Sequence, residues 1–341
     1  MSAPTANWSY PTAVRFGAGR IKELAEACRA AGISRPLLVT DAGLAKLPIT
    51  AQAMDLLKSA GLPVALFADV QSNPVESNVE SGVAVFRAGK HDGVVAFGGG
   101  SGLDTGKVIA FMAGQSRPLW DFEDIGDWWT RAQPDKIAPV VAVPTTAGTG
   151  MDALAHCLEA YCAPSYHPMA EGIAVEGMRL IFVNLPRVVA NGKDLEARAH
   201  MMSAAAMGAT AFQKGLGAIH ALSHPIGALY NTHHGTTNGV FMPYALVFNR
   251  AAIEAKIDRL SGFLGIPDGF NGFLNAVLDL RKKTGVPHDL KALGVDDRKA
   301  DTIVEMSLVD PTASGNPVPL TKESSRKILD AALTGDVAAA A

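Results

Sequence analysis

GVVAFGGGSGLDTGK, residues 93–107, decides the fold expected for the first half of the chain. Its apolar start, residues 93–97, indicates a buried strand, and a helical pattern begins near residue 102. Between the two stand four small residues, Gly98, Gly99, Gly100 and Ser101. Glycines let a diphosphate approach the backbone, and the free N–H groups at a helix start favour an anion. Three glycines alone fit many turns, but a strand, glycines and a helix in this order predict a dinucleotide-binding loop.

The same alternation of strand and helix extends to both sides of this stretch. Further apolar runs predict strands at residues 36–40, 64–67 and 139–143. Helical patterns lie at residues 21–31, 49–60, 75–88 and 102–113. Continuous apolar strands separated by helices imply a parallel sheet that is covered on both faces. We therefore predict a Rossmann-like α/β domain with a parallel sheet over residues 1–150.

The strand pattern ends at Met151, and the rest of the chain has the spacing of helices. Pro and Gly separate the helical runs, which lie at residues 152–161, 169–185, 193–211, 217–230, 244–264, 270–284, 297–309 and 322–333. We therefore predict an all-α domain over residues 151–341. The final residues, 336–341, are expected to fray.

Composition narrows the class of protein. Apolar residues make up 48% and charged residues 18% of the 341 residues, which is typical of a globular chain. A net charge of −3 gives no reason to expect nucleic acid or an anionic membrane as a partner. No apolar run is long enough to span a bilayer, and the N-terminus lacks the features of a signal peptide. Cys28, Cys157 and Cys162 fit small buried side chains, so we expect a cytoplasmic protein.

Histidines gather in the second half of the chain. Residues 215–239, GLGAIHALSHPIGALYNTHHGTTNG, hold four of the nine, namely His220, His224, His233 and His234. Upstream, Asp152 and His156 stand four apart and therefore share one helix face. Imidazole and carboxylate groups that converge in this way suit a metal such as Fe²⁺ or Zn²⁺, although each histidine alone also fits a buried core position. No Glu follows the first His of H-x-x-x-H, which argues against a zinc peptidase.

Polar residues also follow the predicted strands of the first domain. Asp41 comes directly after the strand at residues 36–40, where a carboxylate can accept hydrogen bonds from an adenosine ribose or cap an ordinary turn. Thr145 and Thr146 follow the last strand and fit either a nucleotide contact or a plain loop. Asp104 and Lys107 lie on the first turns of the helix after the glycines.

Taken in chain order, these motifs resemble a known family. The segments GGGSGLDTGK, PTTAGTG, GMDALAHCLEAY, GLGAIHALSHPIGALYNTHHGTTN and NPVPLTKE resemble the iron-containing (group III) alcohol dehydrogenases, over nearly the whole chain from Tyr10 to about Thr334. The resemblance implies a dehydroquinate synthase-like architecture, with NAD(P) and one divalent metal in a cleft between the two domains. It implies hydride transfer between a small alcohol and its aldehyde or ketone, NAD rather than NADP, Fe²⁺ with Zn²⁺ as the alternative, and a homodimer.

The resemblance also assigns roles to individual residues. It places the metal ligands at Asp152, His156, His220 and His234. It places His224 beside the substrate, where we expect it to relay a proton. It assigns cofactor contacts to Gly98, Gly99, Gly100 and Ser101 at the diphosphate, to Asp41 at the ribose, to Thr145 and Thr146 near the nicotinamide, and includes Asp104 in the same motif.

The chain departs from the family pattern at three places. Two are small: Gly106 stands where Ala is usual, and His233 stands where Pro is usual before His-Gly. The third is large, because relatives carry Ser-Glu and a few dozen further residues, including strands, between T-x-G-T-G and Met-Asp-Ala-Leu. Here TAGTG, residues 146–150, runs directly into MDALAH. A sequence artefact, an engineered deletion and a natural short relative all explain such a junction.

Two alternatives to the dehydrogenase therefore stay open. One is an NAD- and metal-dependent lyase of the dehydroquinate-synthase kind, although H-x-x-x-H followed by His-Gly, together with GMDALAH, favours the dehydrogenase. The other is a shortened form whose catalysis is impaired or lost.

Overall fold

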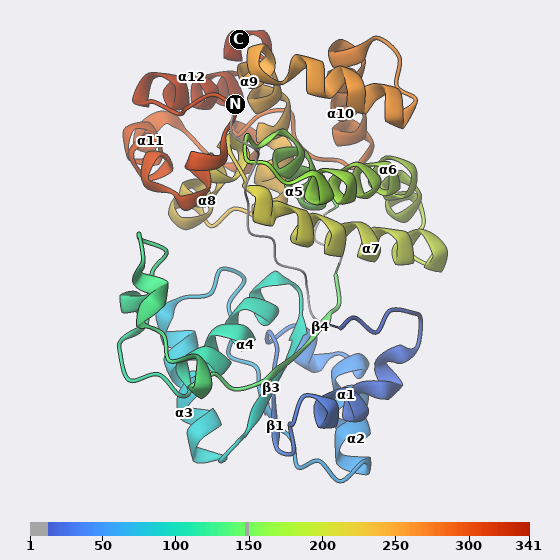
Figure 1. Cartoon of the computed structure of the whole chain (residues 1–341), viewed down its shortest axis with the longest axis vertical. Helices are drawn as coiled ribbons and strands as arrows, with labels where there is room; N and C mark the ends of the chain where they lie inside the picture. Colours follow the sequence, from blue (N-terminus) through green and yellow to red (C-terminus); the bar gives the residue numbers. More distant parts are fainter. Residues whose placement is uncertain (1–12, 147–149) are drawn as a thin grey trace. The chain divides into compact units, whose positions relative to one another are not determined.

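The computed structural model describes residues 13–146 and 150–341. Its internal contacts divide the chain into two compact units (Figure 1). Val14–Thr146 form the first, called here the α/β unit, and residues 150–341 belong to the second, called here the helical unit. None of the helices in the described ranges is long and apolar enough to cross a membrane.

The α/β unit contains a four-stranded parallel sheet with the strand order β2-β1-β3-β4. The strands are β1 (Pro36–Val39), β2 (Ala65–Phe67), β3 (Gly93–Gly98) and β4 (Val140–Pro144). Val39 pairs with Ala96, and Phe97 pairs with Val143, so the carboxyl ends of β1, β3 and β4 lie at one edge of the sheet. The predicted parallel sheet is confirmed.

Alternate side chains of the sheet pack against two separate layers of helices. Leu37 and Val39 pack with residues of α3 (Glu76–Ala88) and α4 (Gly100–Met112). Leu38 and Phe97 pack on the other face with residues of α1 (Leu24–Ala30) and α2 (Pro48–Ser59). Both layers flank the strands in Figure 1. Because both faces are covered, the strands are apolar throughout, which is why the sequence pattern revealed them.

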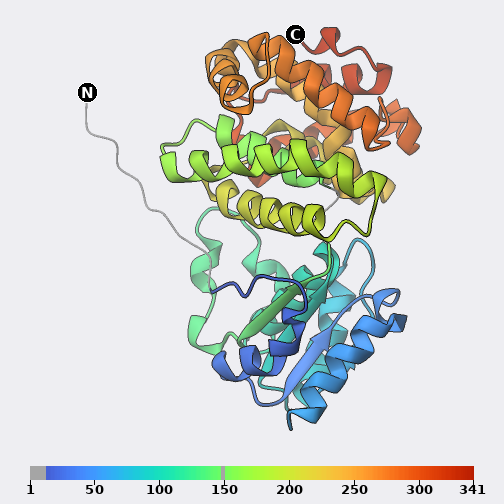
Figure 2. The ribbon, with the colours of Figure 1, turned by 90° about the vertical axis from the view of Figure 1, so that its right-hand side faces the viewer.

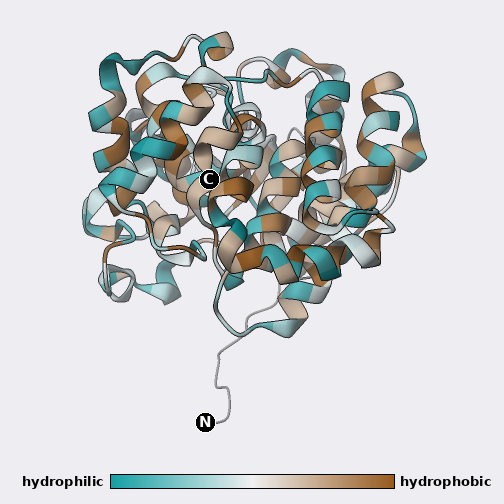
Figure 3. Cartoon of the chain, turned by 90° about the horizontal axis from the view of Figure 1, so that it is seen from above, coloured by the Kyte–Doolittle hydropathy of each residue, from teal (hydrophilic) through white to brown (hydrophobic). Residues whose placement is uncertain are grey.

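The helical unit is built on one continuous apolar core. Its helices are α5 (Met151–Cys162), α6 (Pro168–Ala190), α7 (Leu195–Ala211), α8 (Ala218–Tyr230), α9 (His234–Leu264), α10 (Gly269–Lys283), α11 (Ala300–Val309) and α12 (Lys322–Thr334). Figure 2 shows α6 and α7 side by side in green and yellow-green, and Figure 3 shows apolar and polar residues alternating along the helices. Tyr161, Phe241 and Tyr244 are among the largest fully buried side chains of this core.

Two predicted helix boundaries were wrong, and a proline is the reason in each case. The helix expected to end at residue 185 continues through Pro186 to Ala190, and the helix expected to start at residue 244 already starts at His234 and runs through Pro243. Proline removes one backbone hydrogen bond and crowds the preceding turn, which favours a helix end. Here Asn184 and Leu185, directly before Pro186, and residues 241–246, around Pro243, are buried, and this packing outweighs the local preference.

The expectation of a frayed C-terminus was also wrong. Ala338–Ala340 form a short 3-10 helix, and Ala340 is fully buried. The ammonium group of Lys327 also donates a hydrogen bond to the carbonyl of Ala341. Ala340 alone of these alanines is buried, and nothing in the composition of the segment distinguishes it from a solvated tail.

Candidate metal centre

Helix α5 presents the polar side chains of Asp152 and His156 along one face. Asp152 lies in its first turn, where a carboxylate is favoured by the helix dipole, and His156 follows one turn later. The helix begins after Gly150, whose φ of 78° favours glycine, and a Cβ at this position would lie 2.3 Å from Leu185. The residue at the predicted junction therefore has a local reason to be glycine.

Helices α8 and α9 bring the other histidines to this face. His220 is buried in the first turn of α8, and His224 lies one turn later with 42% of its side chain exposed. Asn231 ends α8 in the left-handed conformation, and α9 then begins at His234. His233 caps α9, because its Nδ1 accepts a hydrogen bond from the Thr236 N–H. His233, which stands where the family usually has proline, thus stabilises the first turn of α9, and His234 is the first residue of that helix.

Asp152, His220 and His234 converge on one point. Their candidate ligand atoms all lie within 4.8 Å of one another. Asp152 Oδ1 is 3.8 Å from His220 Nε2 and 3.5 Å from His234 Nε2. Ligand atoms bonded to one ion at about 2.0–2.2 Å lie roughly 3–4 Å apart, so these three residues fit a single divalent metal.

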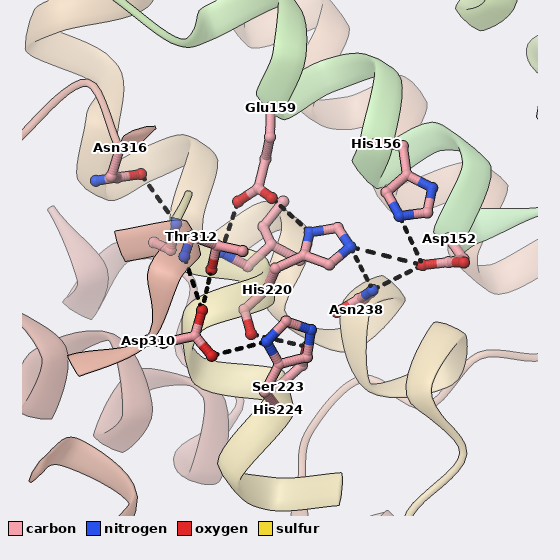
Figure 4. Close-up of polar contacts among 12 residues, drawn as sticks. Asp152, His156, Glu159, His220, Ser223, His224, Asn238, Asp310, Thr312 and Asn316 are labelled. Carbon is pink, nitrogen blue, oxygen red and sulfur yellow. Dashed lines mark hydrogen bonds and ion pairs between the residues drawn. The ribbon is translucent and has the colours of Figure 1, made fainter. Parts of the chain in front are cut away.

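His156, the fourth predicted ligand, lies beside this group without joining it. Its Nε2 is 3.9 Å from Asp152 Oδ1, and its ring stacks on His220 with 4.8 Å between the ring centroids. Figure 4 shows both side chains. The structure therefore brings together three of the four predicted ligands and places the fourth next to them.

Asn238 lies in the middle of the site and was not predicted. Its Nδ2 is 2.8 Å from Asp152 Oδ1, 3.2 Å from His220 Nε2 and 3.1 Å from His234 Nε2. Its Oδ1 is buried and has no hydrogen-bond partner among the described residues. Acceptors gathered around one point, together with an orphaned buried oxygen, fit a site for a cation. The i, i+4 spacing from His234 to Asn238 was the signal that could have revealed this residue.

The charges in the site suit metal binding. Burial raises the pKa of Asp152, but the nearby His220 ring and the attraction of the other histidines outweigh it and hold the pKa well below its usual range. Burial lowers the pKa of His234 to about 4 and also lowers that of His156, so both rings are neutral at pH 7. Burial lowers the pKa of His220 too, but Glu159 and Asp152 raise it to about 9. At pH 7 the metal-free site thus offers an ionised Asp152 and two neutral imidazoles, whereas His220 is protonated and would have to release its Nε2 proton when a metal binds.

His224 is paired with an acid that the sequence did not single out. Its Nδ1 lies 2.8 Å from Asp310 Oδ2, and Asp310 Oδ1 accepts a hydrogen bond from the Thr312 N–H (Figure 4). Burial raises the pKa of Asp310, but the hydrogen bonds from His224 and Thr312 lower it by more, so the pKa lies below its usual value. The His224 ring stacks on His234 at 5.3 Å. His224 therefore lies at the exposed border of the metal group, oriented by a carboxylate.

The predicted cofactor residues of the α/β unit lie at the carboxyl edge of the sheet. Gly99 caps α4, Gly100 is its first residue, and a Cβ added to Gly100 would meet nothing within 4 Å. Thr145 donates its N–H to the Gly98 carbonyl at 2.8 Å, and the Thr146 hydroxyl oxygen lies 3.4 Å from where a Cβ on Gly99 would stand. This open helix start, approached by two threonines, fits an anionic group such as a diphosphate.

The other predicted cofactor residues already have partners within the protein. Asp41 Oδ1 accepts hydrogen bonds from the N–H groups of Gly43 and Leu44, so it caps the turn after β1. Ser101 donates to the Ser72 carbonyl, and Asp104 forms an exposed ion pair with Lys107 at 2.7 Å. The buried hydroxyl of Thr40, beside Gly98, has no hydrogen-bond partner among the described residues. Thr40 was not predicted, because a threonine at a strand end is common.

A parallel α/β unit with an open glycine turn, and a helical unit with an aspartate–histidine centre, are the features expected of an oxidoreductase that uses a metal and a dinucleotide. Residues 11–158 match the family described as iron-containing alcohol dehydrogenase, and residues 146–333 match the C-terminal part of the Fe-containing alcohol dehydrogenase family. The chain belongs to the iron-containing alcohol dehydrogenase family.

Individual relatives agree with this assignment. A 4-hydroxybutyrate dehydrogenase of Cupriavidus necator is 35% identical over 378 aligned positions, which cover 94% of this chain and 98% of the relative. An NAD-dependent methanol dehydrogenase of Bacillus methanolicus is 29% identical, with 96% of this chain and 100% of the relative covered. A crystal structure of a 1,3-propanediol oxidoreductase superposes with a TM-score of 0.86 at 30% identity, covering 97% of this chain and 98% of the other.

These relatives confirm the predicted class of enzyme. The chain is an alcohol dehydrogenase with the dehydroquinate synthase-like two-domain fold, and the lyase alternative is not favoured. Residues 147–149, at the predicted junction, lie outside the described residues.

Proposed function

We propose that this chain is an Fe²⁺- and NAD-dependent dehydrogenase that interconverts a small primary alcohol and its aldehyde. The convergence of Asp152, His220 and His234 on one point carries this proposal. Because two similar proteins are named for a hydroxy acid and a diol, small alcohols with a second polar group are the first candidates for its substrate.

Asp152, His220 and His234 would hold the metal, and His156, next to Asp152, would complete the set. One carboxylate and three imidazoles suit Fe²⁺, and they also suit Zn²⁺. When bound, the ion supplies a Lewis acid for the substrate oxygen, and NAD supplies the hydride acceptor. The ionised Asp152 and the neutral His234 and His156 are already in the protonation state that ligation requires.

His224 would accept the proton that leaves the alcohol. Asp310 accepts a hydrogen bond from His224 Nδ1, which leaves Nε2 as the basic atom of the ring. The side chain is exposed enough to pass the proton to solvent, since 42% of it is accessible. Asp310 keeps the imidazole in this orientation and stabilises its charged form.

The glycine turn would hold the cofactor in the α/β unit. Gly98, Gly99, Gly100 and Ser101 would surround the diphosphate, while Thr145 and Thr146 would approach the nicotinamide. Asp41 uses Oδ1 for its turn, so a ribose contact would fall to Oδ2. A carboxylate at that position favours NAD over its 2′-phosphorylated relative, and one similar protein is named as NAD-dependent.

A shortened form with impaired catalysis is the second candidate, and two observations favour it. The alignment with the 4-hydroxybutyrate dehydrogenase runs over 378 positions, more than the 341 residues of this chain, so the relative holds residues without a counterpart here. The two family matches also overlap at residues 146–158, the segment of the predicted junction. We propose that the lost residues lie at this junction.

Assembly and location are part of the same proposal. We expect a homodimer, as the family resemblance implies. All three cysteines are free and buried, which supports a reducing compartment such as the cytoplasm.

One assay tests the proposed function. The protein is loaded with Fe²⁺ under anaerobic conditions, supplied with NAD or NADP, and offered small primary alcohols, diols and hydroxy acids, while the absorbance of the reduced cofactor is followed. Metal-dependent reduction of NAD with at least one alcohol supports the proposal. Bound metal without cofactor reduction by any alcohol would favour the shortened, inactive form instead.

A further inference from the structure

Glu159 joins the metal centre to the start of α8 although it is not one of the converging ligands. It lies seven residues after Asp152, on the same face of α5, and only 7% of it is exposed. Its Oε2 is 2.6 Å from His220 Nδ1, and its Oε1 accepts a hydrogen bond from the Ile219 N–H at 2.7 Å (Figure 4). One carboxylate thus contacts both the imidazole and the backbone directly before it.

The contact with His220 selects one tautomer of the ring. An ionised carboxylate only accepts hydrogen bonds, so Nδ1 of His220 must carry a proton and donate it to Glu159. The lone pair of the neutral ring is then on Nε2, the atom that faces Asp152. A histidine that binds a metal usually donates its other ring N–H to a carboxylate or a carbonyl in this way.

The backbone contact fixes where His220 stands. The first N–H groups of a helix lack partners within the helix. Here the Ala218 N–H donates to Asn316 Oδ1 at 3.1 Å, and the Ile219 N–H donates to Glu159. Gly217 permits this approach, since a Cβ there would lie 2.7 Å from Asn316 Oδ1 and 3.2 Å from Glu159 Oε1.

We propose that Glu159 is a positioning residue of the metal centre, which sets the tautomer and the orientation of His220 and thereby the affinity for the metal. The inference rests on the proposed metal site. A purely structural cap of α8 would affect stability alone, whereas a positioning residue also affects metal affinity.

Glu159→Gln separates these two roles because the amide has nearly the same shape as the carboxylate. Its single oxygen can accept from Ile219 or from His220, but not from both. When the oxygen accepts from Ile219, the NH₂ group faces His220 Nδ1 and favours the tautomer with hydrogen on Nε2, which blocks ligation. When it accepts from His220, the NH₂ group faces the Ile219 N–H and the helix start shifts.

The test is a chelator competition with Zn²⁺ and Co²⁺ on the full chain, together with the thermal unfolding of the metal-free protein. For Glu159→Gln we expect a metal Kd weakened about 10–100-fold and a changed visible absorption of bound Co²⁺. Glu171→Gln is the matched control, because Glu171 is a carboxylate of the same unit that pairs with Lys214 and Lys256. We expect it to lower the melting temperature and leave the metal Kd within about twofold.

The possible results distinguish the positioning role of Glu159 from the existence of the metal site itself. A Glu159→Gln protein with the wild-type Kd and the wild-type Co²⁺ spectrum would overturn the positioning role while leaving the metal site intact. Wild-type protein that binds neither metal would overturn the proposed site and this inference together. If Glu159→Gln does not fold, Glu159→Asp provides the same test, since the shorter side chain cannot keep both contacts, at 2.6 and 2.7 Å.

Discussion

The amide nitrogen of Asn238 lies 2.8 Å from Asp152 Oδ1 and within 3.2 Å of both histidine nitrogens of the metal group. In the metal-free protein this amide donates a hydrogen bond to the Asp152 carboxylate, which a metal would otherwise neutralise. Without such a donor, an ionised carboxylate held at a largely buried site would be costly. Asn238 thus stabilises the arrangement of ligands before the metal binds.

Asn238→Asp tests this relationship with a nearly isosteric side chain. A second carboxylate beside Asp152 should destabilise the metal-free protein by on the order of 1–3 kcal/mol, because two like charges then share one buried site. A divalent cation neutralises both, so the gain in melting temperature on adding Zn²⁺ should exceed that of the wild type. Calorimetry with and without the metal measures both effects. A metal-free variant as stable as the wild type would contradict the stabilising role of the amide.

Replacing His224 or its partner should slow catalysis without loss of metal. General acid–base groups contribute typically 10²–10⁴-fold, so we expect His224→Ala to lower kcat by about 10²-fold or more. Asp310→Asn keeps the shape of Asp310 but no longer favours the proton on His224 Nδ1, and a smaller loss of about tenfold is expected. Metal content, measured by atomic emission, should match the wild type in both variants. Loss of bound metal, or an unchanged kcat in His224→Ala, would contradict the assigned role.

Because of Lys214, the free energy of unfolding should change with pH in the alkaline range. Its side chain is fully buried, and burial followed by the nearby Lys256 lowers its pKa from 10.5 to about 8. Between pH 8 and 10.5 the unfolded chain binds more protons at this residue than the folded one, so its contribution to stability rises with pH. The rise should total up to about 3 kcal/mol.

Lys214→Met isolates this contribution, because the other titrating groups are shared by the two proteins. The variant also loses the hydrogen bonds to the Tyr161 and Ala163 carbonyls, which adds an offset that hardly depends on pH. The difference in free energy of unfolding, measured by urea titration, should therefore change between pH 8 and 10.5. A constant difference across this range would show that the Lys214 ammonium carries no burial cost.

Gly106→Ala should destabilise the α/β unit although Ala is the better helix former. A Cβ at Gly106 would lie 2.7 Å from the Cβ of Ala96 on β3, so α4 would have to move away from the sheet. We expect a net loss of about 1–3 kcal/mol. Gly172→Ala on α6 is the control, because its Cβ would meet nothing within 4 Å and should stabilise by about 0.5–1 kcal/mol. Equal melting temperatures for Gly106→Ala and the wild type would contradict the close packing.

Local pattern predicted most of the fold, and the errors have a common cause. The runs that became β1 and β3 are apolar at every position because both faces of the sheet are covered. Pro243 and Ala340 were misjudged because their conformation depends on packing against distant helices. Proline and alanine have clear local preferences, but these preferences cannot report such contacts.

The residues of the candidate site likewise fall into two groups, those that spacing along the sequence predicts and those that only the packed structure reveals. Asp152, His220 and His234 were predicted from spacing and resemblance, and the structure brings them together. Glu159 lies at i+7 from Asp152 on α5, so a search for a third polar residue on that face would have found it. Asp310 lies 86 residues beyond His224, and no spacing rule links them. Such a contact becomes visible only when the helices are packed.

The central claim is that Asp152, His220 and His234 bind one divalent ion. The most direct measurement is an anomalous difference map from crystals of the full chain grown with Fe²⁺ or Zn²⁺, with data collected at the absorption edge of the metal. We predict one peak about 2.0–2.2 Å from Asp152 Oδ1 and the Nε2 atoms of both histidines. A peak elsewhere, or one coordinated without Asp152, would contradict it.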